Sequence, residues 1–224
     1  MNRKLIALIV GIMWCSGNFV TSANESNSVL WGLKATVNAE LPGKWRGKNN
    51  SVKMFNPGSG FTVGGVSNIY LGNNFYIEPG VSFFYSQYRY DLIVGGIGVS
   101  EIKNPRLSKL GIEIPVVFGY TFDINNSFAI SVFTGPQIRY ALGGSVGVSE
   151  ANPEDDYESL LMWDTYRRFD CSWKIGIGFP INNFMLSVEA DLGMNNLIKS
   201  SQIAGQSTMS FRENRIGLGL TYYF

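Results

Sequence analysis

The residues that most often carry out chemistry are sparse in this chain, and histidine is absent altogether. Without histidine, the most common general base is missing and a Ser-His relay cannot form. The cluster Gly95-Gly96-Ile97-Gly98 neither follows a buried parallel strand nor opens a helix, as a phosphate-binding loop does. The acidic run Glu154-Asp155-Asp156 lacks the spaced ligands and the glycine of a calcium loop. We therefore expect no enzyme activity, no cofactor and no metal site.

A second set of candidate residues is charged and lies inside otherwise apolar segments. Four of its members are cationic and four are acidic, so the set is balanced. Burying a charge without a partner is costly, so charges enclosed together are expected to pair. The set comprises Lys34, Glu78, Glu113, Arg139, Lys174, Glu189, Asp191 and Arg215. What these charges do depends on the elements that carry them.

Eight segments alternate apolar and polar residues with the period of a β-strand. In the fourth segment Ile112, Ile114 and Phe118 share one face, whereas Gly111 and Glu113 share the other. The charged set falls on the second face throughout. A tilted strand of roughly 9 to 11 residues with one such apolar face is long enough to span a bilayer. The segments are residues 29–40, 60–71, 75–90, 107–122, 128–143, 169–179, 184–195 and 213–224.

The connections between these segments alternate between short and long. Three short turns are rich in Asn and Gly, which tolerate a positive φ, at residues 72–74, 123–126 and 181–183. Four long links lie between them, at residues 41–59, 91–106, 144–168 and 196–212. All short turns therefore share one rim and all long links the other. Outer-membrane barrels have this asymmetry, with short periplasmic turns and longer extracellular loops.

These patterns predict an all-β fold, an eight-stranded antiparallel up-and-down transmembrane β-barrel with both termini in the periplasm. A strand in hydrocarbon must pair all its backbone groups, which requires a closed barrel. The alternative is a soluble lipocalin-like barrel with the apolar face inside around a ligand. Its surface would carry more charge, and its loop lengths would not be sorted by rim. Pro79, Pro115 and Pro136 are expected at bulges or rim positions, because proline removes a ladder hydrogen bond.

The interior of an eight-stranded barrel is only just filled by side chains. We therefore expect the charged set to form a salt-bridge network in the lumen, and a path for ions or small solutes is the alternative. On this assignment Val116→Arg and Leu220→Arg, on the lipid face, should impair insertion. Gly119→Ser, on the lumen face, should be tolerated better.

The N-terminus has the layout of a secretory signal peptide, with Arg3 and Lys4 before a ten-residue apolar run. We expect cleavage after Ala23, so that residues 1–23 are the signal peptide and 24–224 the outer-membrane β-barrel domain. A membrane anchor would need about 20 apolar residues. Lipoprotein processing at Cys15 is disfavoured by the preceding bulky Trp14. Only Cys171 would remain in the mature chain, which excludes an internal disulfide.

Charge also limits the partners. A formal net charge of +1 gives no indication of nucleic-acid binding. The first long link is basic and the third is acidic, so they can pair over the mouth or contact lipopolysaccharide phosphates and divalent cations. The basic residues are Lys44, Arg46, Lys48 and Lys53, and the acidic ones are Glu150, Glu154, Asp155, Asp156, Glu158 and Asp164. Outer-membrane lipid and lipopolysaccharide are the expected partners.

The chain resembles the PorT-like outer-membrane β-barrel domains of Bacteroidota, which are porin-like. The more specific matching stretches are "LSKLGIEIPVVFGYTF" (107–122) and "FTGPQIRYALGG" (133–144), and the others are residues 57–65, 76–86, 169–179, 186–197 and 216–224. The resemblance implies an outer-membrane location and a barrel fold, and it places Pro115 and Pro136 in a shared pattern. PorT itself is linked to a secretion and gliding system.

The last segment alternates up to Tyr222 and Phe224, which resembles the signal that barrel-assembly machinery recognises during biogenesis. We therefore expect a small porin-like barrel whose lumen is largely filled by side chains. Its role would lie in its extracellular loops, in membrane integrity or in low-conductance passage. An accessory subunit of a protein-secretion or surface-attachment complex is one alternative, and a soluble ligand-binding barrel is another.

Overall fold

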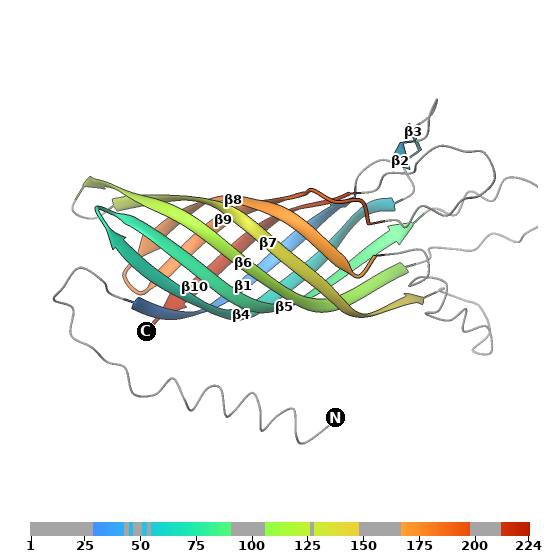
Figure 1. The fold of residues 1–224 in the computed structure, drawn as a ribbon, viewed down its shortest axis with the longest axis horizontal. Helices are drawn as coiled ribbons and strands as arrows, with labels where there is room; N and C mark the ends of the chain where they lie inside the picture. The colour runs from blue at the N-terminus through green and yellow to red at the C-terminus, as the bar shows by residue number, and fades with distance from the viewer. Residues whose placement is uncertain are drawn as a thin grey trace, which may run out of the picture.

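Ten β-strands make up the secondary structure of the computed structural model, which describes residues 29–42, 45–46, 51–52, 55–90, 106–125, 128–147, 167–197 and 212–224. Eight long strands form a closed barrel (Figure 1). They are β1 (Val29–Pro42), β4 (Phe55–Gly72), β5 (Phe75–Tyr90), β6 (Arg106–Asn125), β7 (Phe128–Gly147), β8 (Phe169–Ile181), β9 (Phe184–Gly193) and β10 (Glu213–Tyr223). Among the described residues, no helix is long and apolar enough to cross a membrane.

The barrel closes by pairing of the first strand with the last. Its order is β1-β10-β9-β8-β7-β6-β5-β4, and every neighbouring pair is antiparallel. Ala35 of β1 lies opposite Leu220 of β10 and opposite Val63 of β4, so β1 has two neighbours like every other strand. Closure of this kind leaves no unpaired sheet edge. The predicted eight-stranded up-and-down barrel is confirmed.

Two very short strands lie outside the barrel. β2 (Trp45–Arg46) and β3 (Ser51–Val52) pair only with each other, within the first long link. The sequence does not predict this pair, because two residues are too few to show an alternating pattern.

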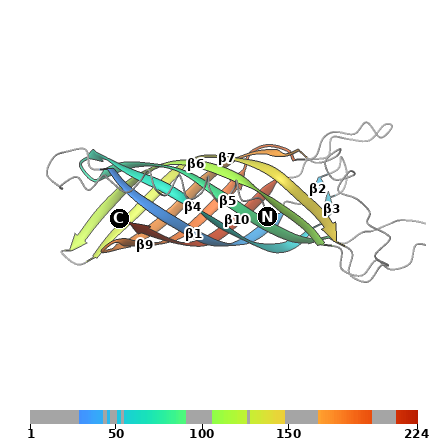
Figure 2. The ribbon, with the colours of Figure 1, turned by 90° about the horizontal axis from the view of Figure 1, so that it is seen from below.

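The strand ends that the short turns connect lie together at one end of the barrel, which we call the turn end, and the opposite strand ends lie at the other, the loop end (Figures 1 and 2). In the turn from β4 to β5, φ is 92° at Gly72, 49° at Asn73 and 66° at Asn74. In the turn from β8 to β9, φ is 52° at Asn182. Glycine and asparagine adopt these angles at low cost. The choice of turn residues therefore produces the tight reversals.

Each barrel strand has an apolar outer face and a smaller or polar inner face. Leu218 on the outer face is 57% exposed, whereas Ser187 and Thr221 on the inner face are fully buried. This arrangement is the opposite of the soluble lipocalin-like alternative, which would place the apolar face inside. Near the turn end the outer face is aromatic, with ring centroids of Phe75 and Tyr120 4.6 Å apart and those of Phe184 and Tyr222 5.0 Å apart.

The three prolines lie inside the strands rather than at bulges or at the rim, so that prediction was wrong. Pro79 pairs with Val116, Pro115 with Gln137 and Pro136 with Trp173, and the register does not shift at any of them. Instead the pairing of residues between neighbouring strands is interrupted beside them. Pairing of β5 with β6 stops after Pro79 and resumes at Ser82, and pairing of β6 with β7 stops after Pro115 and resumes at Phe118. Because proline lacks only one donor, the strand can continue in the same register.

Candidate functional site in the barrel lumen

The lumen contains two regions with different chemistry. The middle and the loop-end half hold ion-paired side chains, which we call the charged band: Lys34, Lys109, Glu113, Arg139, Asp170, Lys174, Glu189, Asp191, Glu213 and Arg215. The turn-end part holds a cavity of about 290 Å³ with aromatic and amide walls, which we call the turn-end cavity. The side chains of the charged band reach the lumen because they occupy alternate, inward positions of the strands.

Arg215 of β10 is at the centre of the charged band. Its guanidinium donates to Asp191 of the neighbouring β9 and to Glu113 of β6. β6 is four strands away from β10 in a ring of eight, so the contact with Glu113 crosses the full width of the lumen. Gln137 of β7 donates to the same two carboxylates, at 3.5 Å to Glu113 and 3.3 Å to Asp191. Side chains from four strands therefore meet at one level.

Two lysines continue the charged band from this centre towards the turn end. The Lys174 ammonium lies 3.1 Å from Asp191 and donates to Glu189 at 2.7 Å. Lys34 of β1 forms an ion pair with the other oxygen of Glu189. Its ammonium also lies 5.5 Å from the centroid of the Phe133 ring. A chain of alternating charges thus runs from β6 through β10, β9 and β8 to β1.

A second layer of the charged band lies nearer the loop end. Lys109 of β6 forms an ion pair with Glu213 of β10, again across the width of the lumen. Arg139 forms an ion pair with Asp170 and lies 3.5 Å from Glu213. The Lys109 ammonium is 4.9 Å from the centroid of the Tyr88 ring. This layer adds a second connection between opposite sides of the barrel.

The structure places all eight charges of the predicted set in the lumen and joins seven of them by ion pairs. Glu78 is the exception: it accepts a hydrogen bond of 2.5 Å from the Tyr223 hydroxyl, with no ion pair among the described residues. The predicted set left out four further inward charges, Glu40, Lys109, Asp170 and Glu213. They lie close to the strand ends, at the same alternate positions that face inwards in the rest of each strand. Extending the alternating pattern to the strand ends could have identified them.

The full lumen set is acidic rather than balanced. Among the described residues it has seven carboxylates and five cationic groups. Glu40 accepts hydrogen bonds from Ser86 at 2.8 Å and Tyr88 at 3.1 Å, and Glu78 accepts one from Tyr223. These two carboxylates are bound by hydroxyl groups instead of cations. One lies towards each end of the barrel, because Glu40 is near the end of β1 and Glu78 near the start of β5.

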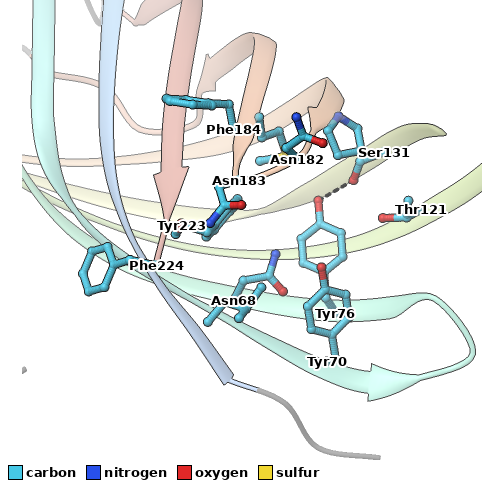
Figure 3. Close-up of a pocket in the computed structure, with 13 residues that line it drawn as sticks. Asn68, Tyr70, Tyr76, Thr121, Ser131, Asn182, Asn183, Phe184, Tyr223 and Phe224 are labelled. Carbon is cyan, nitrogen blue, oxygen red and sulfur yellow. Dashed lines mark hydrogen bonds between the residues drawn. The ribbon is translucent and has the colours of Figure 1, made fainter. Parts of the chain in front are cut away.

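The turn-end cavity lies between the charged band and the short turns (Figure 3). The Tyr76 hydroxyl and Ser131 Oγ share a hydrogen bond of 2.6 Å, and Asn183 Nδ2 donates to the Tyr223 carbonyl at 3.1 Å. Its lining is Leu30, Asn68, Tyr70, Tyr76, Thr121, Ser131, Pro180, Asn182, Asn183, Phe184, Met185, Tyr223 and Phe224. None of these side chains carries a formal charge. The cavity is therefore chemically distinct from the charged band, which lies nearer the loop end.

The comparison with known families decides where such a barrel belongs. A sequence model described as "Outer membrane protein beta-barrel domain" matches residues 21–199. The chain belongs to this outer-membrane barrel family. Among curated proteins, none has a sequence that matches it.

Several solved structures are similar to this outer-membrane barrel. Neisserial surface protein A has 12% identity and a TM-score of 0.42, covering 89% of this chain and 100% of that one. OprG of Pseudomonas aeruginosa has 10% identity and a TM-score of 0.42, covering 89% and 96%. AlkL, solved in lipid bilayers, has 9% identity and a TM-score of 0.48, covering 93% and 96%.

Family membership supports an outer-membrane location for the barrel, so its exposed apolar face contacts lipid. Leu220, on that face, is 49% exposed. Tyr222 and Phe224 also face outwards, with ring centroids 6.5 Å apart, and the Phe224 amide donates to the Trp31 carbonyl at 2.9 Å. Their role as an assembly signal stays a prediction. The signal peptide and the acidic residues of the third link lie outside the described residues, as do the basic residues of the first link apart from Arg46.

The structure shows a cost for one substitution in the lumen of this outer-membrane barrel. Gly119→Ser was expected to be tolerated better than arginine on the lipid face because Gly119 faces the lumen, and that ranking stays a prediction. A Cβ at Gly119 would overlap the ring of Tyr76, which lies opposite it on β5 and is buried. The Tyr76 hydroxyl is held by Ser131, so the ring cannot turn away without losing that bond. The alternating pattern identifies the face of a residue but not the side chain across from it.

Proposed function

We propose that this outer-membrane barrel is a closed membrane element rather than an open pore, and that its role is carried by its loop end. The observation that supports closure is the contact between Arg215 and Glu113, which joins opposite sides of the lumen. A second crossing, from Lys109 to Glu213, lies nearer the loop end. An eight-stranded barrel has little free width, and two layers of paired charge occupy it.

The energy of buried ion pairs also supports a lumen that is closed to solutes. A solute that passed between Arg215 and Glu113 would have to separate a buried ion pair. Leaving one partner of such a pair alone costs about 3 to 5 kcal/mol. Arg215 and Lys174 each contact two carboxylates, so the separation would disturb several pairs at once. Passage through the charged band is therefore limited to low conductance.

We further propose that the turn end faces the periplasm and the loop end the outside. The placement of all short turns at one end supports this orientation, since outer-membrane barrels have short periplasmic turns. The loops would then be available to lipopolysaccharide, whose phosphates suit the basic residues of the first long link. The similarity of residues 107–122 and 133–144 to PorT-like domains supports a place within that group of barrels.

Conductance in a planar lipid bilayer tests the closed state. The refolded protein should give no discrete current steps of porin size. Arg215→Ser removes the crossing side chain and should produce small, stable steps. Arg215→Lys is the matched control, because it keeps a cation in the lumen and should remain closed. Porin-like steps from the unmodified protein would exclude the proposal.

A further inference from the structure

The turn-end cavity is lined by one buried polar group, Asn68, whose amide oxygen has no hydrogen-bond partner among the described residues. Asn68 is 4% exposed, and its Oδ1 accepts no hydrogen bond. The Asn68 amide lies between Tyr76 and Tyr223 at the edge of the cavity (Figure 3). Glu78 lies directly behind this edge, since its carboxylate accepts a hydrogen bond from the Tyr223 hydroxyl. The unsatisfied Asn68 oxygen is an acceptor, and the carboxylate behind it is negatively charged, so this edge of the cavity suits a donor that carries positive charge.

The surroundings give the cavity a negative electrostatic character. No Lys or Arg lines it. Lys34 lies towards the turn end of the charged band and is held by Glu189. Tyr70, Tyr76 and Tyr223 line the cavity, and aromatic faces attract cations. A cation entering from the turn end would therefore meet an amide oxygen and aromatic rings, with the Glu78 carboxylate behind them.

We propose that the turn-end cavity binds an aliphatic ammonium group, from either a small free amine or a lysine side chain. The ammonium supplies the N–H donors that Asn68 Oδ1 lacks, and its charge compensates Glu78. The alkyl chain packs against Leu30 and Met185, which contribute the apolar part of the lining. A volume of about 290 Å³ suits a small ligand. This site lies apart from the charged band and does not depend on whether the barrel conducts.

Methyl NMR of the refolded protein in nanodiscs measures this binding directly. Met185 lines the cavity, whereas Met194 lies on the outer face with 56% of its surface exposed. With labelled methionine methyl groups, n-butylammonium should shift the Met185 signal in a saturable manner and leave Met194 unchanged. Butyrate should not bind, and neutral n-butanol should bind at least about tenfold more weakly. Equal binding of n-butanol and n-butylammonium would overturn the proposal.

Two carboxylates provide a matched pair of variants. Glu78→Gln should weaken n-butylammonium binding about tenfold or more. Glu40→Gln removes the corresponding hydroxyl-bound carboxylate at the other end of the lumen and should leave the affinity unchanged. Ser131→Phe fills the cavity without altering Glu78 and should abolish the Met185 shift. Equal effects of the two glutamine variants, or full binding by Ser131→Phe, would contradict a site in this cavity.

The source of the ammonium is decided by comparing probes. Nα-acetyl-lysine methylamide presents a lysine side chain within a peptide backbone. Tighter binding of this probe than of n-butylammonium identifies a lysine of a polypeptide as the ligand. Equal or weaker binding identifies a free amine. Either result retains recognition of the ammonium group, whereas absence of binding by both probes would exclude it.

Discussion

The charged band and the turn-end cavity occupy the same lumen and are built by the same strands, yet they are stabilised differently. In the charged band, long side chains cross the barrel and form ion pairs, such as Arg215 with Glu113. In the cavity, Thr121, Ser131 and Met185 leave open space, and contacts such as that of Tyr76 with Ser131 are short-range hydrogen bonds. The two levels therefore differ in whether inward side chains reach across the barrel, although the same strands build both.

This difference has an energetic consequence. The charges in the band are buried, so losing one partner leaves the other charge uncompensated, and each pair depends on the next. Hydroxyl and amide groups around the cavity lose less when a partner is removed. We expect substitutions in the charged band to be costly and to affect several strands, and those around the cavity to be mild and local. Three substitutions test this difference, in order of decreasing effect.

Removing the central cation should have the largest effect. Arg215→Met leaves Glu113 and Asp191 without their shared cation, and we expect a loss of about 3 to 5 kcal/mol in the free energy of unfolding. Urea unfolding in lipid vesicles measures this loss. Arg215→Lys, which keeps the charge, should lose clearly less. A loss below about 1 kcal/mol for Arg215→Met would show that the band contributes little to stability.

An arginine on the outer face of the barrel should destabilise the protein, whereas Arg215 in the lumen stabilises it. Leu220→Arg places an arginine in contact with lipid, five residues after the arginine that stabilises the lumen. We expect it to lower the free energy of unfolding by about 2 to 4 kcal/mol, provided that the position is near the bilayer midplane. Folding yield into lipid vesicles and urea unfolding measure the effect. Leu220→Phe is the control, and an equal result for both variants would contradict the assignment of faces.

The smallest effect is expected at the cavity. Tyr76→Phe removes the hydrogen bond to Ser131 but keeps the ring that packs against Gly119 and Phe133. We expect a loss of about 1 kcal/mol. A double-mutant cycle with Ser131→Ala isolates the contribution of the bond. If Tyr76→Phe cost as much as Arg215→Met, the two regions would not differ in the way described.

The strands and their faces could be predicted because they depend on local order along the chain. Alternation with period 2 identifies which residues point inwards, and the Asn and Gly turns identify where the chain reverses. Partner identity could not be predicted in the same way. Arg215 and Glu113 are 102 positions apart and belong to opposite strands, so their contact depends on barrel closure and on the register of all strands between them.

The predicted lumen set was incomplete for a related reason. Glu40 ended its predicted segment at position 40, whereas β1 continues to Pro42, and Glu213 was the first residue of its segment. Charges at the ends of alternating segments look like loop residues, because the pattern stops there. The register places Glu40 opposite Arg215 and Glu213 opposite Pro42, inside the barrel. Balance between cations and carboxylates therefore cannot be judged from segment interiors alone.

The prolines of β5, β6 and β7 have a mechanical consequence. Pro79 is opposite Val116, which follows Pro115, and Pro115 is opposite Gln137, which follows Pro136, so the interruptions of the ladder continue from strand to strand. Fewer cross-strand bonds resist bending along this line than elsewhere around the circumference. The barrel wall should therefore deform more easily along this line than between β8 and β9, where the pairing is uninterrupted.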